Sequence, residues 1–312
     1  MTNKKIVVTG AAGLVGQNLI IQLKEAGFKS IVGIDKHVNN SKILRQLHPD
    51  IQVIIADIAQ AGGWTEALAG ADIAIMLHAQ IGAKDSKLFL DNNVTATRVM
   101  LQQIKQHRIP YVIHVSSSVV ESVAKDEYTN TKKLQEQLVV DSAVDYCILR
   151  PTLMFGWFDR KHLGWLSRFM QRIPVFPIPR DGKFMRQPLY ARDFCKIITS
   201  CVTLCPSRQI YNITGQEKIY YIDMIKKIKQ AIGAKTLVLT IPYWLFWLLL
   251  RVYAMFSSDP PFTVEQLKAL TAGDEFELIE WWKIFNITPT SLHDAIHETF
   301  TDPTYSKIVL EF

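Results

Sequence analysis

The stretch T-G-A-A-G-L-V-G, Thr9 to Gly16, decides the fold expected for this chain. It follows the apolar run 6–8, which is typical of a buried strand, and precedes apolar residues at helical spacing over 14–23. Glycines at such a strand-to-helix turn permit a tight bend and a close backbone approach to a ligand. The free N–H groups at the start of the helix, together with its dipole, attract an anion such as a pyrophosphate. The residues expected to hold that group are Gly10, Gly13, Leu14, Val15 and Gly16.

A second apolar run, 31–34, ends in Asp35. An acidic residue about 20 residues beyond a glycine turn is placed to accept hydrogen bonds from the ribose diol of an adenine dinucleotide. Its carboxylate would repel a 2′-phosphate, so the expected cofactor is NAD rather than NADP. Lys36, which we include among the cofactor-binding residues, and His37 act against that repulsion through their positive charge.

Composition limits the classes of protein that fit. The chain has 312 residues, of which 48% are hydrophobic and 21% charged, as in globular proteins. Its net charge of +6 suits an anionic ligand, but it has no block of Lys and Arg, so no nucleic-acid partner is expected. The four cysteines do not have the spacing of a zinc site, and the N-terminus has no signal-peptide pattern. Both observations predict a cytoplasmic protein with reduced thiols. His293 and His297 have a metal-like spacing but no third ligand, so no metal is expected.

Strands and helices alternate over residues 1–150. This alternation predicts an α/β fold with a doubly wound parallel sheet of the Rossmann type, in which ligands bind outside the carboxyl ends of the strands. After Pro151 the elements become shorter and less regular, so residues 151–312 are expected to form a smaller C-terminal α/β domain that binds the substrate. The polar residues that fall at predicted strand ends are Asp35, Asp57, His78 and the serines 116–118.

Tyr128 and Lys132 lie four residues apart on one face of a helix predicted over 127–140. A free tyrosine has a pKa of ~10, and a lysine ammonium beside it, together with the positive nicotinamide, is expected to lower that pKa by favouring the phenolate. Tyr128 could then act as general base or acid toward a substrate hydroxyl. A serine at the end of the preceding strand would orient the same oxygen. Ser117 is the expected residue and Ser118 is the alternative.

The order of these features resembles that of the extended short-chain dehydrogenase/reductase family, in its NAD-dependent epimerase/dehydratase group. The resemblance covers nearly the whole chain and includes D-N-N-V at 91–94, Arg150-Pro151 and Phe155-Gly156. It implies that Asn93 bridges the active site and a helix. It also implies that Arg186, within D-G-K-F-M-R-Q-P-L-Y-A-R-D-F at 181–194, grips a substrate diphosphate with its guanidinium. On this resemblance the further cofactor-binding residues are Asp57, Ile58, His78, Ala79, Gln80, Asn93, Ser116, Tyr128, Lys132 and Pro151, and Ser118 joins Arg186 at the substrate.

The chain departs from the family pattern at three points. Glu121-Ser122 stands where the family has Tyr-Gly, and only 11 positions separate Ser117 from Tyr128. Leu153 takes a place where nucleotide-sugar epimerases commonly carry Asn. The first departure keeps Ser118 open beside Ser117, and Leu153 weakens the sugar-nucleotide interpretation without touching the cofactor.

The expected function is that of an NAD-dependent oxidoreductase or epimerase acting on a hydroxyl carbon of a nucleotide-activated sugar, by hydride transfer with Tyr128 as acid and base. Sugar epimerases, dehydratases and dehydrogenases need the same serine, tyrosine and lysine, so the sequence leaves these reactions open. One alternative is a hydroxysteroid-dehydrogenase-like alcohol dehydrogenase with a lipidic substrate. Another is a redox-silent NAD-binding structural subunit, against which Tyr128 and Lys132 argue. A homodimer is the expected assembly.

The most apolar stretch of the chain is I-P-Y-W-L-F-W-L-L-L-R-V-Y-A-M-F, residues 241–256. It is too short to span a bilayer, and Arg251 interrupts it. The favoured interpretation is a helix packed on the substrate domain. The alternative is an aromatic helix that makes peripheral contact with a membrane surface.

Overall fold

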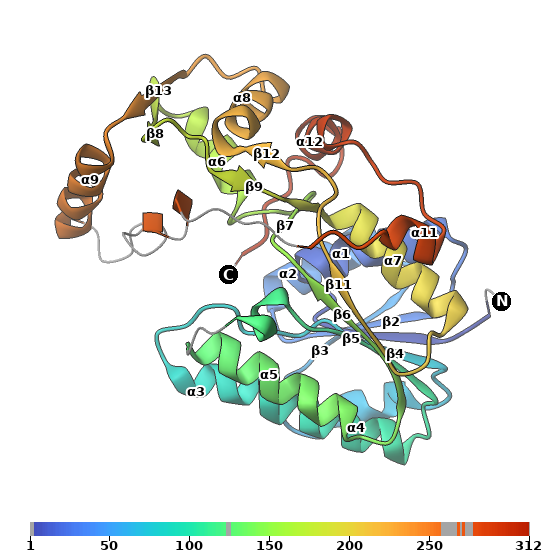
Figure 1. Cartoon of the computed structure of the whole chain (residues 1–312). Coiled ribbons are helices and arrows are strands. Elements are labelled where there is room, and N and C mark those ends of the chain that lie inside the picture. The colour runs from blue at the N-terminus through green and yellow to red at the C-terminus, as the bar shows by residue number, and fades with distance from the viewer. Residues whose placement is uncertain (1–2, 123–125, 257–266, 269, 272–276, 312) are drawn as a thin grey trace.

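A seven-stranded, all-parallel sheet forms the centre of the protein (Figure 1). The computed structural model describes residues 3–122, 126–256, 267–268, 270–271 and 277–311. The expected doubly wound α/β fold is confirmed, because the strand order reverses direction on either side of β1. From one edge to the other, the strands are β11 (Gln209–Ile213), β6 (Asp145–Pro151), β5 (Tyr111–Val115), β4 (Ile73–Met76), β1 (Ile6–Thr9), β2 (Ile31–Asp35) and β3 (Gln52–Ile55).

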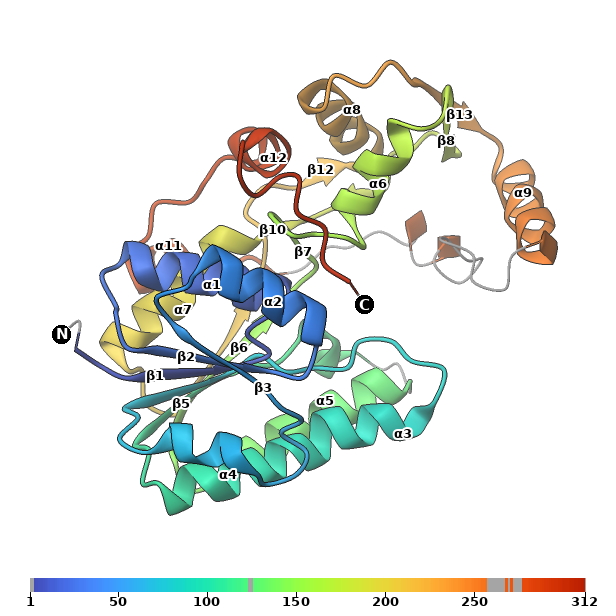
Figure 2. The same ribbon diagram turned by 180° about the vertical axis from the view of Figure 1, so that it is seen from behind.

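Helices cover both faces of this sheet, which explains why its strands are apolar on both sides (Figures 1 and 2). Along β1, Ile6 and Val8 pack into the core on one face and Val7 into the core on the other. The first face carries α1 (Leu14–Glu25), α2 (Val38–Leu47), α7 (Ala191–Leu204) and α11 (Trp281–Phe285). The second carries α3 (Ser86–Phe89), η2 (Leu90–Thr95), α4 (Ala96–Gln106) and α5 (Glu127–Val140), with the short 3₁₀ helix η1 (Gly63–Leu68) after β3.

The helical segment that follows β4, from Ser86 to Gln106, is interrupted in the structure. Between α3 and α4, the segment η2 is a π-helix, in which one wider turn changes the direction of the following side chains. Asn93 is fully buried in this wide turn. Such turns occur frequently at functional sites, and apolar periodicity alone does not reveal them.

A smaller layer with its own apolar core lies above the first face of the sheet (Figure 1). Three elements beyond residue 150 return to the large sheet, because β11 pairs with β6, α7 packs beside α1 and α11 packs against α7. The sheet therefore does not end at the boundary expected at residue 150. The smaller layer contains β7 (Met154–Phe155), α6 (Leu163–Met170), β8 (Val175–Pro179), β9 (Met185–Arg186), β10 (Leu189–Tyr190), β12 (Ile219–Tyr220), α8 (Tyr221–Ala231), β13 (Leu237–Ile241) and α12 (Leu292–Thr301).

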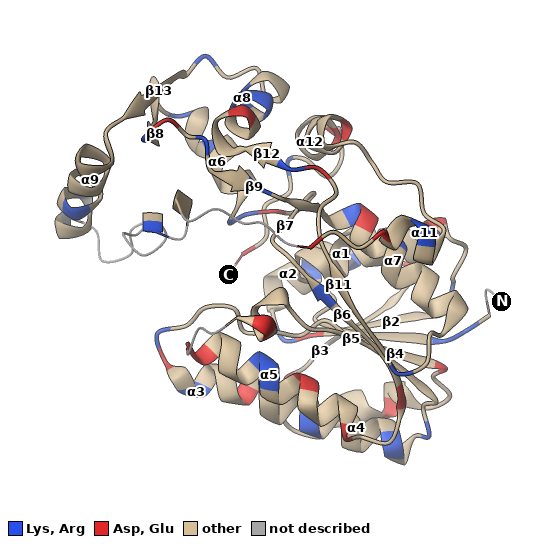
Figure 3. Ribbon diagram, viewed as in Figure 1, with Lys and Arg blue, Asp and Glu red and all other residues tan. Residues whose placement is uncertain are grey.

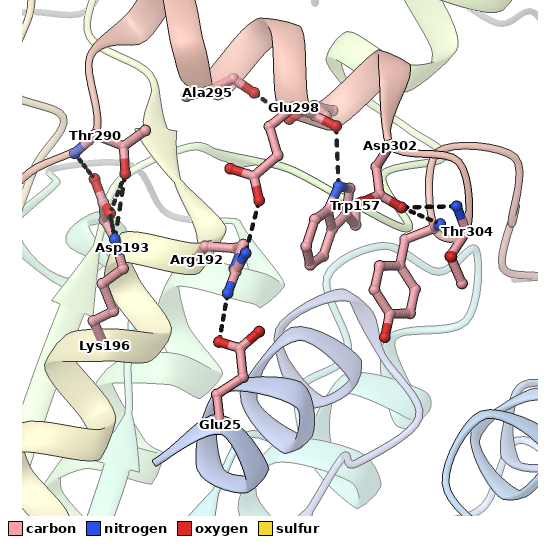
Figure 4. A network of polar contacts seen from close by, with 12 residues as sticks. Glu25, Trp157, Arg192, Asp193, Lys196, Thr290, Ala295, Glu298, Asp302 and Thr304 are labelled. Atoms are coloured by element: carbon pink, nitrogen blue, oxygen red, sulfur yellow. Dashed lines mark hydrogen bonds and ion pairs between the residues drawn. The ribbon is translucent and has the colours of Figure 1, made fainter.

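Charged side chains of α7 tie the C-terminal helix to the large sheet (Figure 4). The Arg192 guanidinium reaches Glu25 of α1 at 2.5 Å and Glu298 of α12 at 2.7 Å. Next to it, the Asp193 carboxylate accepts hydrogen bonds from the backbone N–H and the hydroxyl of Thr290, both at 2.8 Å. These bonds join three elements that are far apart in sequence, so they hold α12 in place over the sheet.

The apolar helix α9 (Tyr243–Phe256) lies at the far end of the smaller layer in both views (Figures 1 and 2). None of its side chains that the structure describes is buried. The favoured interpretation, a helix packed on the substrate domain, is confirmed in part, because α9 contacts β8 of the smaller layer and several of its side chains are half-buried. α9 follows β13, which pairs with β8 in a separate two-stranded sheet. Among the described residues, no helix has the length and hydropathy needed to cross a membrane.

Candidate active site

The glycine turn connects β1 to α1 and leaves no room for side chains. Gly10 has φ +69°, and a Cβ there would lie 2.8 Å from the backbone nitrogen of His78. A Cβ at Gly16 would lie 2.4 Å from the carbonyl oxygen of Ala11. Gly13 precedes α1 without a side-chain cap from the described residues, so the N–H groups of the first turn are available to an anion. In that first turn are Leu14, Val15 and Gly16.

Asp35 ends β2 directly beside this turn. Its two carboxylate oxygens accept hydrogen bonds from the N–H groups of Ala12 and His37, each at 2.9 Å. Burial raises the pKa of Asp35, and these two hydrogen bonds oppose the rise. Each oxygen keeps lone pairs for a further donor, such as a ribose hydroxyl. Lys36 directs its ammonium to the Asn92 side chain at 2.5 Å.

Asn93 joins two parts of the site, as the resemblance implies. Its side-chain oxygen accepts from the N–H of Gln80 at 2.6 Å, in the loop after β4. Its side-chain nitrogen donates to the Thr131 hydroxyl at 2.9 Å, in the helix that carries Tyr128 and Lys132. The amide therefore fixes the loop 78–80 against helix α5.

The structure brings Ser117 and Tyr128 together. Ser117 lies just after β5, and its side chain hydrogen-bonds to Tyr128. Burial raises the pKa of Tyr128, and the bond with Ser117 opposes this as the smaller effect. The expected lowering depends on the positive nicotinamide as well as on Lys132, so it stays a prediction for the protein with bound cofactor. Ser118 instead begins the 3₁₀ turn η3 (Ser118–Glu121).

Lys132 lies one helical turn after Tyr128. Its side chain is completely buried, and the ammonium donates to the carbonyl of Val115 at 3.1 Å and to the side-chain oxygen of Gln135 at 2.5 Å. Burial lowers the pKa of Lys132 to about 7, while the Glu136 carboxylate acts in the opposite direction. A lysine that is only partly protonated near neutral pH gives Tyr128 less electrostatic help than a full ammonium.

A chain of buried polar groups extends from Lys132 to the glycine turn, and sequence reasoning missed it. Gln135 donates to the Thr97 hydroxyl at 2.8 Å, and the same hydroxyl lies 2.9 Å from Nε2 of His78. Nδ1 of His78 lies 2.7 Å from the hydroxyl of Thr9. The sequence signal for this chain of polar groups was Gln135, which lies three positions after Lys132 on the buried face of the same helix.

The remaining predicted residues lie on both layers. Asp57 accepts from the N–H of Ala59 at 2.9 Å, and Ile58 and Pro151 are buried. Arg186 lies on β9 opposite Ile219, in the smaller layer and not in the sheet that holds the serine and tyrosine. Its charge acts to lower the pKa of Tyr221, against the larger opposing effect of burial.

Comparison with known proteins identifies the family. A model of the NAD dependent epimerase/dehydratase family matches residues 6–214. The chain belongs to this family. The crystal structure of UDP-glucuronic acid 4-epimerase from Bacillus cereus in complex with NAD matches with a TM-score of 0.70 at 22% identity, over 95% of this chain and 97% of that one. The UDP-glucose 4-epimerase of Vibrio cholerae is 19% identical over 278 residues, 80% of this chain and 82% of the relative. The ceramide reductase of Caulobacter vibrioides is 19% identical over 242 residues, 76% of this chain and 73% of the relative.

Membership makes the chain an NAD-dependent enzyme, and the described residues fit that cofactor. The backbone at Gly10 and Gly16 is packed too closely for any side chain, as a pyrophosphate turn requires. Asp35 stands beside it with lone pairs to spare. At the end of β5, the buried Ser116 hydroxyl has no hydrogen-bond partner within the described part of the chain, and a bound ligand could satisfy it.

Proposed function

We propose that this epimerase/dehydratase family member oxidises a hydroxyl carbon of a nucleotide sugar, with Tyr128 accepting the hydroxyl proton. The observation that carries the proposal is the hydrogen bond between Ser117 and Tyr128 at the same sheet edge as the glycine turn. A serine that holds the phenol oxygen can hold a substrate hydroxyl beside it. Proton transfer then occurs within one hydrogen-bonded pair.

The chain's own residues divide the work. Bound NAD supplies the acceptor for the hydride that leaves the substrate carbon. Tyr128, as phenolate, takes the proton from the hydroxyl on that carbon, and Ser117 keeps the two oxygens in line. Lys132 contributes positive charge from the same helix, and Gln135 and the Val115 carbonyl hold its ammonium in position. If the reaction is an epimerisation, Tyr128 returns its proton in the reverse step.

Arg186 supports a substrate with a diphosphate. It is half-buried on β9 of the smaller layer. A guanidinium donates two parallel hydrogen bonds to phosphate oxygens, which a sugar nucleotide offers and a simple alcohol lacks. The Bacillus cereus and Vibrio cholerae proteins are named as epimerases of UDP-linked sugars, in agreement with such a substrate.

A lipidic alcohol is the second candidate, because of Leu153. This side chain packs against the apolar core of the smaller layer, and an apolar wall suits a hydrocarbon better than a sugar. A ceramide reductase is among the related proteins. The two candidates differ in whether Arg186 has an anion to bind.

The test of the proposal is Tyr128→Phe in the full-length protein, after a screen of UDP-, GDP- and dTDP-sugars identifies the substrate. We expect turnover to fall by roughly 10²–10⁴-fold, as is usual for loss of a general acid–base group. NAD affinity, measured by calorimetry, should stay nearly unchanged because only the hydroxyl is removed. Tyr220→Phe, at an exposed tyrosine of β12, is the matched control and should leave turnover unaltered. Full activity of the Tyr128 variant would disprove the assigned chemistry.

A further inference from the structure

The helix α9 exposes an apolar stripe, made of Trp244, Leu248, Leu249, Val252 and Met255. Met255 is 80% and Trp244 65% exposed. The spacing of these residues places them along one side of the helix. Arg251 is the only charged residue in α9, so the helix is apolar all around. A helix of this kind is stable where another apolar phase covers it.

The exposed apolar surface continues from α9 onto the two-stranded sheet that precedes it. Leu237 and Leu239 of β13 point to one side of the strand and are both exposed. Val175 of β8 pairs in register with Leu237 and is exposed as well. α9, β8 and β13 lie at the same end of the molecule (Figure 2), so these exposed apolar side chains are all found in that part of the smaller layer.

The part of the chain around this area is strongly basic. Residues 160–188 and 216–256 contain thirteen Lys and Arg against three Asp and Glu. The rest of the chain contains 22 Lys and Arg against 26 Asp and Glu. Arg251 makes α9 basic as well, and Figure 3 shows blue on this helix. Arg180 is exposed and donates its backbone N–H to the carbonyl of Ile241, the last residue of β13 before α9.

We propose that α9 docks this enzyme onto an anionic lipid surface. The stripe enters the boundary between headgroups and acyl chains, and the surrounding Lys and Arg residues bind the lipid phosphates and carboxylates. With 14 residues, α9 is about 21 Å long, shorter than the ~30 Å hydrocarbon core, so it lies in the plane of the surface. The Arg251 guanidinium lies 5.0 Å from the Trp247 ring, and both groups are typical of the headgroup level.

The charge around α9 favours an anionic lipid surface over a second copy of the chain as the partner that covers this helix. Two copies joined through their α9 helices would bring together two regions with a large positive excess. Like charges at such an interface repel each other. An anionic bilayer instead offers an apolar interior and a negative surface at once, which are the two properties that α9 and its surroundings complement.

The experiment is co-sedimentation of the full-length protein with vesicles. We compare pure phosphatidylcholine vesicles with vesicles of 70% phosphatidylcholine and 30% phosphatidylserine, at low and high salt. Binding should require phosphatidylserine and should weaken at high salt, because salt screens the attraction. Leu248→Glu should lower the partition coefficient by about tenfold, since a carboxylate then faces the acyl chains. Met255→Glu, at the most exposed residue of the stripe, should act in the same direction without disturbing the fold.

Leu204→Glu is the matched control. Leu204 is 59% exposed at the end of α7, away from the basic region, and its substitution should leave vesicle binding unchanged. The proposal is overturned if wild type fails to bind the phosphatidylserine vesicles, or if Leu248→Glu and Met255→Glu bind like wild type. It is overturned as well if the wild type forms a dimer that Leu248→Glu dissociates while neither protein binds vesicles, because a second copy then covers α9.

Discussion

The two layers of the molecule hold their functional side chains in different ways. In the sheet layer, Lys132 and Asn93 are completely buried, and each makes hydrogen bonds to at least two other groups. In the smaller layer, Arg186 is half-buried on a strand of two residues, and α9 has no buried side chain among those described. Groups that must meet a reacting atom need a fixed position, and burial with several hydrogen bonds provides it.

The two layers also differ in their charge. The positive excess of the chain comes from residues 160–188 and 216–256, which belong to the smaller layer, while the remainder of the chain carries slightly more acidic than basic residues. Buried groups in fixed positions determine the chemistry at the cofactor, whereas exposed charges determine which ligands are attracted to the protein. The comparison predicts large effects from substitutions in the sheet layer and smaller, substrate-dependent effects in the other.

The largest difference should separate two adjacent serines. Ser117→Ala removes the hydroxyl that bonds to Tyr128, and we expect turnover to fall by roughly 10²-fold or more, as for other groups that orient a proton transfer. Ser118→Ala, one residue later in η3, should change turnover by much less. Steady-state kinetics of both variants on the same substrate give the comparison. A larger loss for Ser118 would show that the serine assignment is one residue out of register.

Arg186→Ala tests the contribution of the smaller layer. On a nucleotide sugar, loss of the guanidinium removes charge-assisted hydrogen bonds of roughly 1.5–3 kcal/mol, so KM should rise by about ten- to a hundredfold while NAD affinity is retained. On an uncharged lipidic alcohol the same variant should be nearly neutral. Arg180→Ala, at an exposed arginine of the same layer, is the control and should leave KM unchanged. A flat response on a confirmed nucleotide sugar would mean that Arg186 does not bind the substrate.

Much of the sheet layer could be predicted because its signals are local. Apolar runs ending at Thr9, Asp35 and Val115 are strands, and the Tyr128–Lys132 spacing places both residues on one helix. Each of these features depends on residues close together in sequence. The glycine turn is the strongest of these local signals, because the positive φ and the close packing at Gly10 admit only glycine.

The features that escaped prediction depend on contacts between distant residues. The bond from Lys132 to Gln135 continues through Thr97, 35 positions away, and the lowered pKa of Lys132 follows from burial by several elements. In the π-turn, the Asn93 side chain likewise bonds both the loop after β4 and helix α5. The position of α9 at the end of the smaller layer depends on the pairing of β13 with β8, residues that are about 60 positions apart, and an apolar sequence by itself indicates burial.

Gln135→Leu should weaken the sheet layer from within. The variant leaves the Lys132 ammonium and the Thr97 hydroxyl without their shared partner, which costs about 1–3 kcal/mol in the free energy of unfolding. Losing an acceptor of its protonated form should also lower the pKa of Lys132 below about 7, so activity should fall more at pH 7.5 than at pH 6. Gln137→Leu, exposed on the same helix, is the control for urea unfolding and for the pH profile. Equal behaviour of the two variants would exclude a positioning role for Gln135.

We expect the smallest effect from replacing a buried histidine of the sheet layer, His114, in comparison with an exposed histidine of the smaller layer, His293. His114 is completely buried on β5 with neither ring nitrogen hydrogen-bonded by a described residue, and burial, Lys132 and His78 hold its pKa well below 6.5. Below pH 6.5 the unfolded chain therefore binds a proton at His114, whereas the native protein does not. The stability that depends on neutral His114 is present above pH 6.5 and declines as the pH falls. The slope for one such group is about 1.4 kcal/mol per pH unit. His114→Leu should make the urea-unfolding free energy less steep by that amount between pH 6 and 4.5, whereas His293→Leu, at an exposed histidine of α12, should leave the slope of wild type unchanged. Parallel slopes for wild type and His114→Leu would show that His114 takes up a proton in the native protein, and that this part of the sheet layer is less closed than its burial indicates.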